Sequence, residues 1–390
     1  MKIESLKPNW RRVKFGDVVR LSKARSQDPL TDGFERYVGL EDLEPGDLRI
    51  RSWGNVADGV TFTSVFKPGQ VLFGKRRAYQ RKVAVADFSG VCSGDIYVFE
   101  CIDSNTLLPE LLPFICQTDA FFNHAVGTSA GSLSPRTNWT SLANFEFVLP
   151  PMQEQQRIFS VLDQVNDQVE RYNELLGTTA QLIASLGQAE FVDSDVPVVS
   201  LGQVCGQGGI QIGPFGAQLH SYDYTTEGVP VVMPTDMTDG KIALDRIARV
   251  SEEKASALQQ HRILAGDILL PRRGELDRRA WVSDLEEGWL CGTGSIRIRT
   301  PNHINSKGVF YALSTPKTVN WLKANAVGTT MPNLNSKIVA TIPIKLPSPQ
   351  RLDVVVSALD ELAETFRSVE ARRAKTLNIK WQVLATCFGV

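Results

Sequence analysis

Residues 148–191 read VLPPMQEQQRIFSVLDQVNDQVERYNELLGTTAQLIASLGQAEF, and the expected architecture follows from this stretch. Apolar residues recur there at alternating spacings of four and three, which is the heptad pattern of a coiled-coil helix. Pro150-Pro151 suits a helix start, because the N–H groups of a first turn have no intrahelical partner. The sequence predicts a long helix over residues 150–192, with one polar break at Thr179. The predicted seam comprises Ile158, Leu162, Val165, Val169, Tyr172, Leu176, Ile183 and Leu186.

The same pattern returns 197 positions later, in residues 345–388, which read KLPSPQRLDVVVSALDELAETFRSVEARRAKTLNIKWQVLATCF. Ser348 before Pro349 is a suitable N-cap, and a second helix is expected over residues 347–390. Long matching seams favour an antiparallel coiled coil, with two ordinary amphipathic core helices as the alternative. The second seam breaks at Arg372-Arg373 and comprises Val355, Leu359, Leu362, Phe366, Val369, Leu377, Trp381 and Leu384.

The repeat extends upstream of each helix, with slightly different offsets that loops of unequal length would require. The matching segments are residues 15–18 and 201–204, 68–72 and 265–269, and 125–129 and 326–330. The chain is therefore expected to contain an internal repeat of one unit, a globular block followed by a helix. The blocks are expected over residues 1–149 and 193–346, and a helix follows each of them.

Each globular block is expected to be mixed α/β. Short apolar runs bounded by glycine and proline predict strands at residues 69–73, 95–99, 266–270 and 295–299. One helix is expected near the end of each block, over residues 107–123 and 306–325. The predicted fold is thus mixed α/β with an internal pseudo-two-fold repeat.

The composition is that of an ordinary globular protein without a membrane span. The chain has 390 residues, a formal net charge of −1 and a hydrophobic content of 43%, and no apolar run approaches the ~20 residues that cross a bilayer. No secretory signal is recognisable at the N-terminus. The six cysteines form no CxxC pair, which predicts a cytoplasmic chain with reduced thiols and neither a zinc nor a redox motif.

Motifs for catalysis are weak. Gly69–Lys75 matches most of a phosphate-binding loop, but Arg76 follows where a serine or threonine would bind magnesium. Leu149–Met152 has the two prolines of a DNA amino-methyltransferase motif but neither its polar acceptor nor its aromatic ring. The four histidines (124, 220, 261 and 303) have no metal-ligand spacing. The sequence does not exclude a nuclease or hydrolase site built from paired carboxylates, although no motif indicates one.

The positive signals are basic. Each block has a cluster of cations directly after the same predicted strand, and such clusters neutralise phosphates or bind guanine edges. A solvated charged face is the alternative, but its recurrence in both blocks favours contact with DNA. The predicted contacts are Lys75, Arg76, Arg77, Tyr79, Arg81 and Lys82 in the first block, and Arg272, Arg273, Arg278 and Arg279 in the second.

Two glycine–threonine loops are the second candidate site, because small polar side chains and one cation suit phosphates and base edges. Aligned on Gly127 and Gly328, the loops place Arg136 opposite Lys337. A turn that caps the next strand is the alternative. Gln218 and His220, in the glycine-rich segment 213–220, form a third and weaker candidate. The loop residues predicted to contact DNA are Ser132, Ser134, Arg136, Thr330, Asn333, Asn335 and Lys337.

These motifs together resemble the specificity subunits of Type I restriction–modification systems, over nearly the whole chain. The most specific element is the run Leu149-Pro-Pro-Met-Gln-Glu-Gln-Gln-Arg157 that leads into the heptad helix. Supporting elements are the block-then-helix repeat, residues 68–72 and 265–269, and Gly213-Pro-Phe-Gly-Ala-Gln-Leu219 followed by Gly228-Val-Pro. The second copy departs from the pattern, since Leu346-Pro-Ser-Pro-Gln-Arg351 lacks the Glu-Gln pair.

The resemblance implies two target recognition domains, separated by the antiparallel helices, that each read half of a split, asymmetric site in double-stranded DNA. It also implies two methyltransferase subunits that bind S-adenosylmethionine, and restriction subunits that use ATP and Mg²⁺. The chain itself would be non-catalytic, without a cofactor or metal. Apolar Val161, Leu175 and Leu182 lie outside the seam and predict partner contacts. The alternatives are a self-contained DNA methyltransferase and a coiled-coil adaptor without a DNA role.

Overall fold

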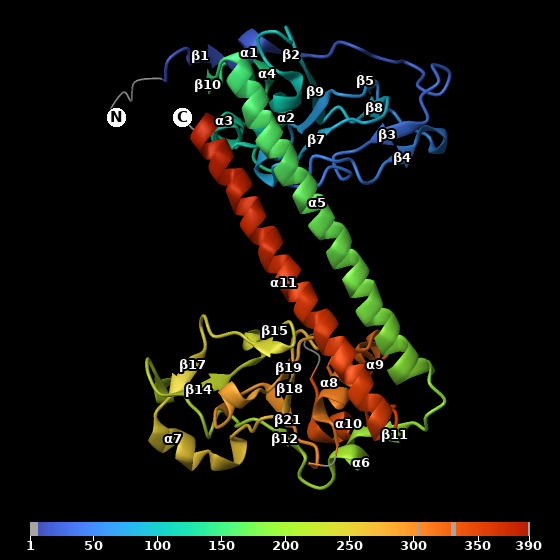
Figure 1. Ribbon diagram of the computed structural model, residues 1–390, viewed down its shortest axis with the longest axis vertical. Helices are drawn as coiled ribbons and strands as arrows, with labels where there is room; N and C mark the ends of the chain where they lie inside the picture. Colours follow the sequence, from blue (N-terminus) through green and yellow to red (C-terminus); the bar gives the residue numbers. More distant parts are fainter. Residues whose placement is uncertain (1–6, 303, 329–332, 389–390) are drawn as a thin grey trace. The chain divides into compact units, whose positions relative to one another are not determined.

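The computed structural model describes residues 7–302, 304–328 and 333–388 (Figure 1). The chain divides into two compact units. Unit 1 consists of Met1–Asn173 and Ala371–Val390, and unit 2 consists of Glu174–Glu370. Both units contain sheets and helices, which confirms the mixed α/β class. Among the described helices, none has the length and apolar character that a membrane span requires.

Unit 1 contains two four-stranded sheets. The first has the order β2-β9-β6-β7 and is antiparallel throughout. Its strands are β2 (Val19–Leu21), β9 (Ile96–Cys101), β6 (Val71–Gly74) and β7 (Val83–Val85). The second has the order β4-β3-β8-β5, with β3 parallel to β8. Its strands are β4 (Gly54–Asn55), β3 (Arg36–Val38), β8 (Gly90–Cys92) and β5 (Ser64–Phe66).

The first sheet of unit 1 packs against helices through a phenylalanine-rich core. Phe15, Phe73, Phe99 and Phe121 are fully buried, with ring centroids about 5 Å apart. Such aromatic pairs add to the stabilisation that their burial already provides. The remaining elements are β1 (Arg11–Lys14), α1 (Phe15–Val18), α2 (Leu112–Gln117), α3 (Asp119–Gly127), α4 (Trp139–Ala143) and β10 (Glu146–Leu149), and β1 pairs with β10.

Unit 2 repeats the first sheet with the same strand order, β12-β21-β18-β19. Its strands are β12 (Ile210–Ile212), β21 (Ser295–Ile298), β18 (Ile268–Pro271) and β19 (Ala280–Trp281). The second sheet, β13-β17-β14-β20, retains one parallel pair, β14 with β20. Its strands are β13 (Tyr224–Thr225), β17 (Ala248–Val250), β14 (Val229–Val232) and β20 (Leu290–Cys291).

The other elements of unit 2 follow those of unit 1, apart from an added β-hairpin and one short helix. The strands are β11 (Val199–Ser200), which pairs with β22 (Pro343–Ile344), and the hairpin strands β15 (Met237–Thr238) and β16 (Lys241–Ile242). The helices are α6 (Leu201–Cys205), α7 (Glu252–Ala257), α8 (Ser306–Ser314), α9 (Pro316–Asn325) and α10 (Ser336–Ala340).

The backbone confirms the internal repeat at atomic detail. Gly16 in α1 and Gly202 in α6 lie against Ala143 and Ala340, where a Cβ would have no room at Gly16 and little room at Gly202. An added Cβ would lie 2.7 Å from the Ala143 Cβ in unit 1 and 3.1 Å from the Ala340 Cβ in unit 2. The two alanines are separated by the same 197 positions as the helix seams.

The prediction of one helix over residues 107–123, and of one over 306–325, was wrong. A threonine interrupts each: Thr118 lies between α2 and α3, and Thr315 lies between α8 and α9. Both threonines have extended backbones, and their hydroxyls accept hydrogen bonds from Phe121 N at 3.2 Å and Thr318 N at 3.3 Å. A threonine that caps a new helix therefore ends the preceding one.

The long helices are α5 (Met152–Gln188) and α11 (Pro349–Phe388). In unit 1, Ile158 and Leu162 of α5 pack in one core with Leu384 of α11. In unit 2, Ile183 packs in one core with Leu359. The start of α5 thus meets the end of α11, and its end meets the start of α11, which confirms the antiparallel pair. All predicted seam residues are buried or half-buried.

The polar breaks of the seams do not interrupt either helix. α11 continues through Arg372-Arg373, and the Thr179 hydroxyl donates to Leu175 O at 2.7 Å. Lys380 lies buried in the α11 seam, only 2% exposed, with its ammonium above the rings of Phe114 and Trp381. A buried lysine at a seam position was not predicted.

Candidate nucleic-acid interface

In unit 1, the basic segment that follows β6 lies beside the loop that precedes α4. Arg76 and Arg136 form an antiparallel β-bridge. Arg77 N donates to Pro135 O at 2.7 Å, and Thr137 N donates to Lys75 O at 3.0 Å. The fold therefore brings together the two candidate sites of the first block, which lie about sixty positions apart in the sequence.

Asp95 links the two arginines of this bridge. Its carboxylate accepts from Arg136 Nε at 2.7 Å and from Arg76 Nη1 at 3.3 Å. The Arg136 hydrogen bond lowers the pKa of Asp95 and outweighs the opposing effect of burial, so the carboxylate is ionised at neutral pH. The arginine side chains are 49% and 37% exposed, whereas Asp95 is 20% exposed. Two accessible guanidinium groups thus share one sheltered anion.

Ser134 binds the same arginines from the loop. Its hydroxyl accepts from Arg76 Nη2 at 3.1 Å and from Arg77 Nη2 at 3.3 Å. The Nε atoms of Arg76 and Arg77 are buried without a partner among the described residues. Ser134 therefore organises cations, and Ser132 is exposed in the same loop. We call Lys75, Arg76, Arg77, Asp95, Ser134 and Arg136 the first basic cluster.

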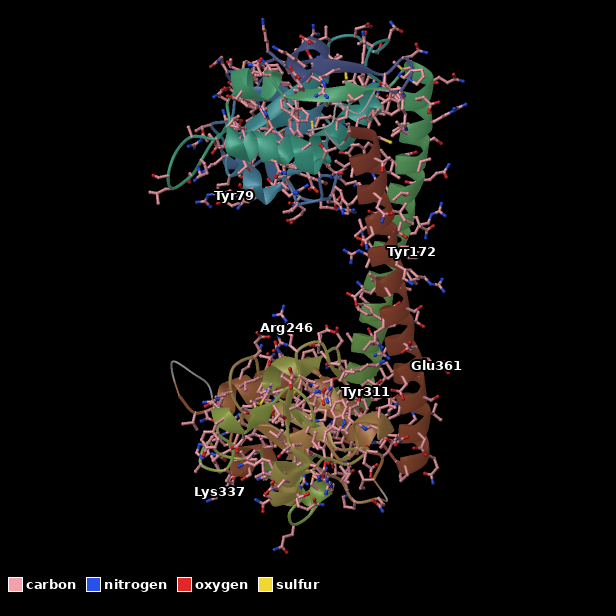
Figure 2. All side chains as sticks on the ribbon, turned by 90° about the vertical axis from the view of Figure 1, so that its left-hand side faces the viewer. Tyr79, Tyr172, Arg246, Tyr311, Lys337 and Glu361 are labelled. Atoms are coloured by element: carbon pink, nitrogen blue, oxygen red, sulfur yellow. The ribbon has the colours of Figure 1, made fainter. Side chains whose placement is uncertain are left out.

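The other predicted contacts of unit 1 differ in their accessibility. Tyr79 is 56% exposed and lies at the surface, on the side of unit 1 away from α5 and α11 (Figure 2). Lys75 Nζ lies 4.7 Å from the Tyr97 ring centroid. Arg81 pairs with Asp119 at 2.6 Å, and Lys82 Nζ donates to Leu40 O at 2.8 Å. These last two cations already have partners inside the fold.

Unit 2 repeats the backbone of the first basic cluster. Arg273 and Asn333 form the antiparallel bridge that corresponds to Arg76 and Arg136, again 197 positions later. Leu334 N donates to Arg272 O at 2.7 Å, as Thr137 N does to Lys75 O. We call Arg272, Arg273, Gly294 and Asn333 the second basic cluster.

The expected alignment of Arg136 with Lys337 was therefore wrong, because Asn333 occupies the corresponding place. Gly127 is the last residue of α3, whereas Gly328 lies beyond the end of α9 and has a φ of 109°. The two glycines are thus not equivalent. Asn335 corresponds instead to Asn138, and the Asn335 side chain accepts from Ile338 N at 2.9 Å as the N-cap of α10.

The side chains of the second basic cluster differ from those of the first. Arg272 Nε donates to Asn333 Oδ1 at 3.1 Å, and its guanidinium lies 5.3 Å from the Phe215 ring centroid. Arg272 N donates to the carbonyl of Gly294, just as Lys75 N donates to that of Asp95. Gly294 carries no carboxylate, and among the described residues no acidic side chain pairs with the exposed Arg273.

The remaining cations of unit 2 have mixed roles. Arg279 is 7% exposed and donates to the carbonyls of Leu313 and Asp277, and burial lowers its pKa to about 10. These contacts indicate a structural role rather than the predicted DNA contact. Arg278 pairs with Glu275 at 2.6 Å. Lys337 lies at the surface of unit 2, on the side away from α11 (Figure 2).

The glycine-rich segment 213–220 contributes one residue that the sequence did not single out. Phe215 is 56% exposed beside Arg272. Gln218 Oε1 accepts from Phe215 N at 3.2 Å, and the His220 ring stacks on Tyr222 at 4.9 Å. Gly213 is required by the fold, because an added Cβ would lie 2.0 Å from Gly292 O. Thr330 and His303 lie outside the described residues.

No group of three or more His, Cys, Asp or Glu side chains that could hold a metal ion occurs within residues 7–302, 304–328 and 333–388. The six cysteines are free. Burial is the main cause that raises the thiol pKa of five of them, for example that of Cys92 to about 12. The same direction holds for Cys387, so the thiols are protonated and unreactive at neutral pH.

Comparison with known proteins adds a consistent set of relatives. Residues 9–176 and 222–378 match the model of the family described as Type I restriction modification DNA specificity domain. The Type I restriction enzyme EcoDI specificity subunit of Escherichia coli is 28% identical over 195 residues, which span 45% of this chain and 41% of that relative. The MjaVIII specificity subunit of Methanocaldococcus jannaschii is 20% identical, over 95% of this chain and 92% of its own.

Solved structures share the fold over nearly the full length. The Type-I restriction-modification system S subunit from M. genitalium superposes with a TM-score of 0.64 at 16% identity, covering 99% of this chain and 98% of that one. A chain from a structure that describes complex assembly and conformational transition of the type I R-M system superposes with a TM-score of 0.54 at 20% identity, covering 98% of each chain.

Proposed function

Because the chain belongs to the Type I restriction–modification DNA specificity family, we propose that it reads a split, asymmetric site in double-stranded DNA. As a specificity subunit it is non-catalytic. Unit 1 reads one half of the site and unit 2 reads the other. The observation that carries this proposal is the repeated bridge, Arg76–Arg136 in one unit and Arg273–Asn333 in the other. One backbone arrangement with different side chains suits two half-sites of different sequence.

The chemistry of the two clusters fits DNA. Arginine binds phosphates, and it can also donate two hydrogen bonds to O6 and N7 of guanine. Asparagine can bind adenine, because its amide N–H donates to N7 and its amide oxygen accepts from the N6 amino group. The chain as a whole has a net charge of −1, so attraction to DNA must come from local clusters rather than from overall charge. Arg136 and Arg273 occupy opposite sides of the repeated bridge, and both are exposed, as such contacts require.

We further propose that the long helices dock two methyltransferase subunits, which bind S-adenosylmethionine, and that restriction subunits using ATP and Mg²⁺ join them. Three apolar side chains of α5 support this, because they are exposed outside the seam: Val161 at 46%, Leu175 at 44% and Leu182 at 52%. Leu182→Ser should weaken co-purification with a methyltransferase subunit, and Gln181→Ser, at an exposed polar neighbour, should not.

The adaptor alternative fits less well. A coiled coil that only joins partners has no need for two equivalent arginine-bearing clusters on the globular units. It remains distinguishable by experiment, because an adaptor would leave the DNA preference of the complex unchanged when either cluster is altered.

The test is selection of bound sequences from random duplexes by the chain in complex with its methyltransferase partners. Arg136→Ala should change one half of the selected site, and Arg273→Ala should change only the other half. Arg157→Ala is the matched control, because this exposed arginine lies on α5 and pairs with Glu154. Failure of the wild-type complex to select a sequence, or a change in both halves from one substitution, would contradict the proposal.

A further inference from the structure

The first basic cluster contains an acidic residue where DNA contact would favour only cations. Asp95 directly precedes β9, and its carboxylate accepts hydrogen bonds from both Arg136 and Arg76. We propose that Asp95 is a positioning residue, which orients Arg136 toward a guanine in the half-site that unit 1 reads. This inference rests on the proposed function and names a specificity determinant within it.

The contacts of Arg136 leave one edge of its guanidinium available. Nε and Nη2 face the two oxygens of Asp95, at 2.7 and 3.4 Å. Nη1 has no partner among the described residues, and half of the side chain is exposed. The end edge, formed by Nη1 and the second hydrogen of Nη2, can therefore donate two parallel hydrogen bonds, which is the geometry that guanine O6 and N7 accept.

Asp95 is itself firmly placed, so it can orient another residue. Its backbone carbonyl accepts from Lys75 N at 2.9 Å, and its N–H donates to Ser93 Oγ at 3.2 Å. The bridge between Arg76 and Arg136 fixes the backbone on the other side. An arginine ordered before DNA arrives loses less conformational entropy on binding, which strengthens discrimination between bases.

The charge of Asp95 has a second effect. One carboxylate offsets part of the positive charge of two guanidinium groups, so the cluster attracts phosphates of any sequence less strongly. Asp95 should therefore raise specificity while lowering non-specific affinity. A residue that only stabilised the fold would not separate these two quantities.

Unit 2 lacks this arrangement and so serves as an internal reference. Gly294 stands in the place of Asp95, and Asn333 stands in the place of Arg136. In unit 2 the acceptor is the amide oxygen of Asn333, which accepts from Arg272, and no carboxylate takes the part that Asp95 has in unit 1. Changes at Asp95 should consequently affect one half-site and leave the other as a built-in control.

The experiment compares Asp95→Asn with wild type in complex with the methyltransferase partners, using selection from random duplexes and titration of a non-specific duplex. Asp95→Asn should reduce discrimination at one guanine of the first half-site by about tenfold or more, with non-specific affinity unchanged or higher. Asp58→Asn, an exposed acid elsewhere in unit 1, is the charge-matched control and should change neither quantity.

Arg136→Lys provides a second variant that preserves charge and should preserve folding. This variant should lose the preference for guanine at the same base pair, because the lysine ammonium lacks the planar pair of N–H donors that the arginine guanidinium has. In the double variant, Asp95→Asn should add little to that loss, since both act through one contact. Weaker binding to all sequences with unchanged base preference, or a change in the second half-site, would overturn the inference. If Arg136→Ala changes one half-site but Asp95→Asn does not, only this inference fails and the proposed function stands.

Discussion

Replacing Lys380 by methionine should stabilise unit 1, although it removes a charge from a helix seam. The residue is 2% exposed, and burial lowers the pKa of its ammonium from 10.5 to about 8, with Asp47 opposing the effect. One pH unit corresponds to about 1.4 kcal/mol, so protonated Lys380 costs the folded state ~3 kcal/mol. Methionine has a similar length and needs no hydration.

The sign of the pH dependence follows from the lowered pKa. Below about pH 8 the folded and unfolded chains both carry the ammonium, and the full cost of burying it is present. Between pH 8 and 10.5 the unfolded chain retains the proton that the folded chain has released, so wild-type stability rises with pH in this window. The advantage of Lys380→Met should therefore shrink by about 1.4 kcal/mol between about pH 7 and pH 9.

The assay is equilibrium denaturant unfolding of the full chain, with the wild-type free energy subtracted from that of the variant at each pH. This difference removes the contributions of all other titrating groups that the substitution leaves alone. Lys375→Met is the matched control, because this exposed lysine lies on the same helix and should show neither the gain nor its pH dependence. A variant that is less stable than wild type at both pH values, or a gain that stays constant with pH, would refute the reasoning.

Three further outcomes are expected. Arg76→Ala combined with Arg77→Ala should reduce the slope of log affinity against log salt by about one per lost phosphate contact, as measured by DNA titration at several salt concentrations. Gly16→Ala should destabilise the protein by about 1–3 kcal/mol, and Gly202→Ala by less, because the added Cβ meets Ala143 more closely than Ala340; thermal unfolding would measure both. Gly177→Ala should instead raise the free energy of unfolding by up to ~1 kcal/mol in the same assay, because alanine favours a helix and the added Cβ has nothing within 4 Å in α5. A lower free energy of unfolding would contradict this expectation.

The sequence by itself determined the architecture, because the features that define it are periodic or repeated. The heptad spacing that includes Leu162 and Leu359 predicted both helices and their buried faces, since a helix must bury every third or fourth residue against a partner. The offset of 197 positions predicted two equivalent units, and the same strand order in β2-β9-β6-β7 and β12-β21-β18-β19 confirms it. Cations after β6 and β18 were likewise visible in the sequence.

Only the tertiary structure decided how those cations are arranged. Asp95 joins Arg76 and Arg136 across about forty residues of sequence, and a carboxylate beside a strand carries no local signal of its partner. Burial of Arg279 and Lys380 was equally invisible. Arg279 belongs to a basic run that suggests a solvated face, and Lys380 precedes the seam residue Trp381 without any local sign that its own side chain is buried. The equivalence of Arg136 with Asn333 required the backbone, because similar glycine–threonine motifs mark different positions relative to α3 and α9. Local periodicity encodes which faces are buried, whereas the pairing of polar side chains depends on distances that only the folded chain establishes.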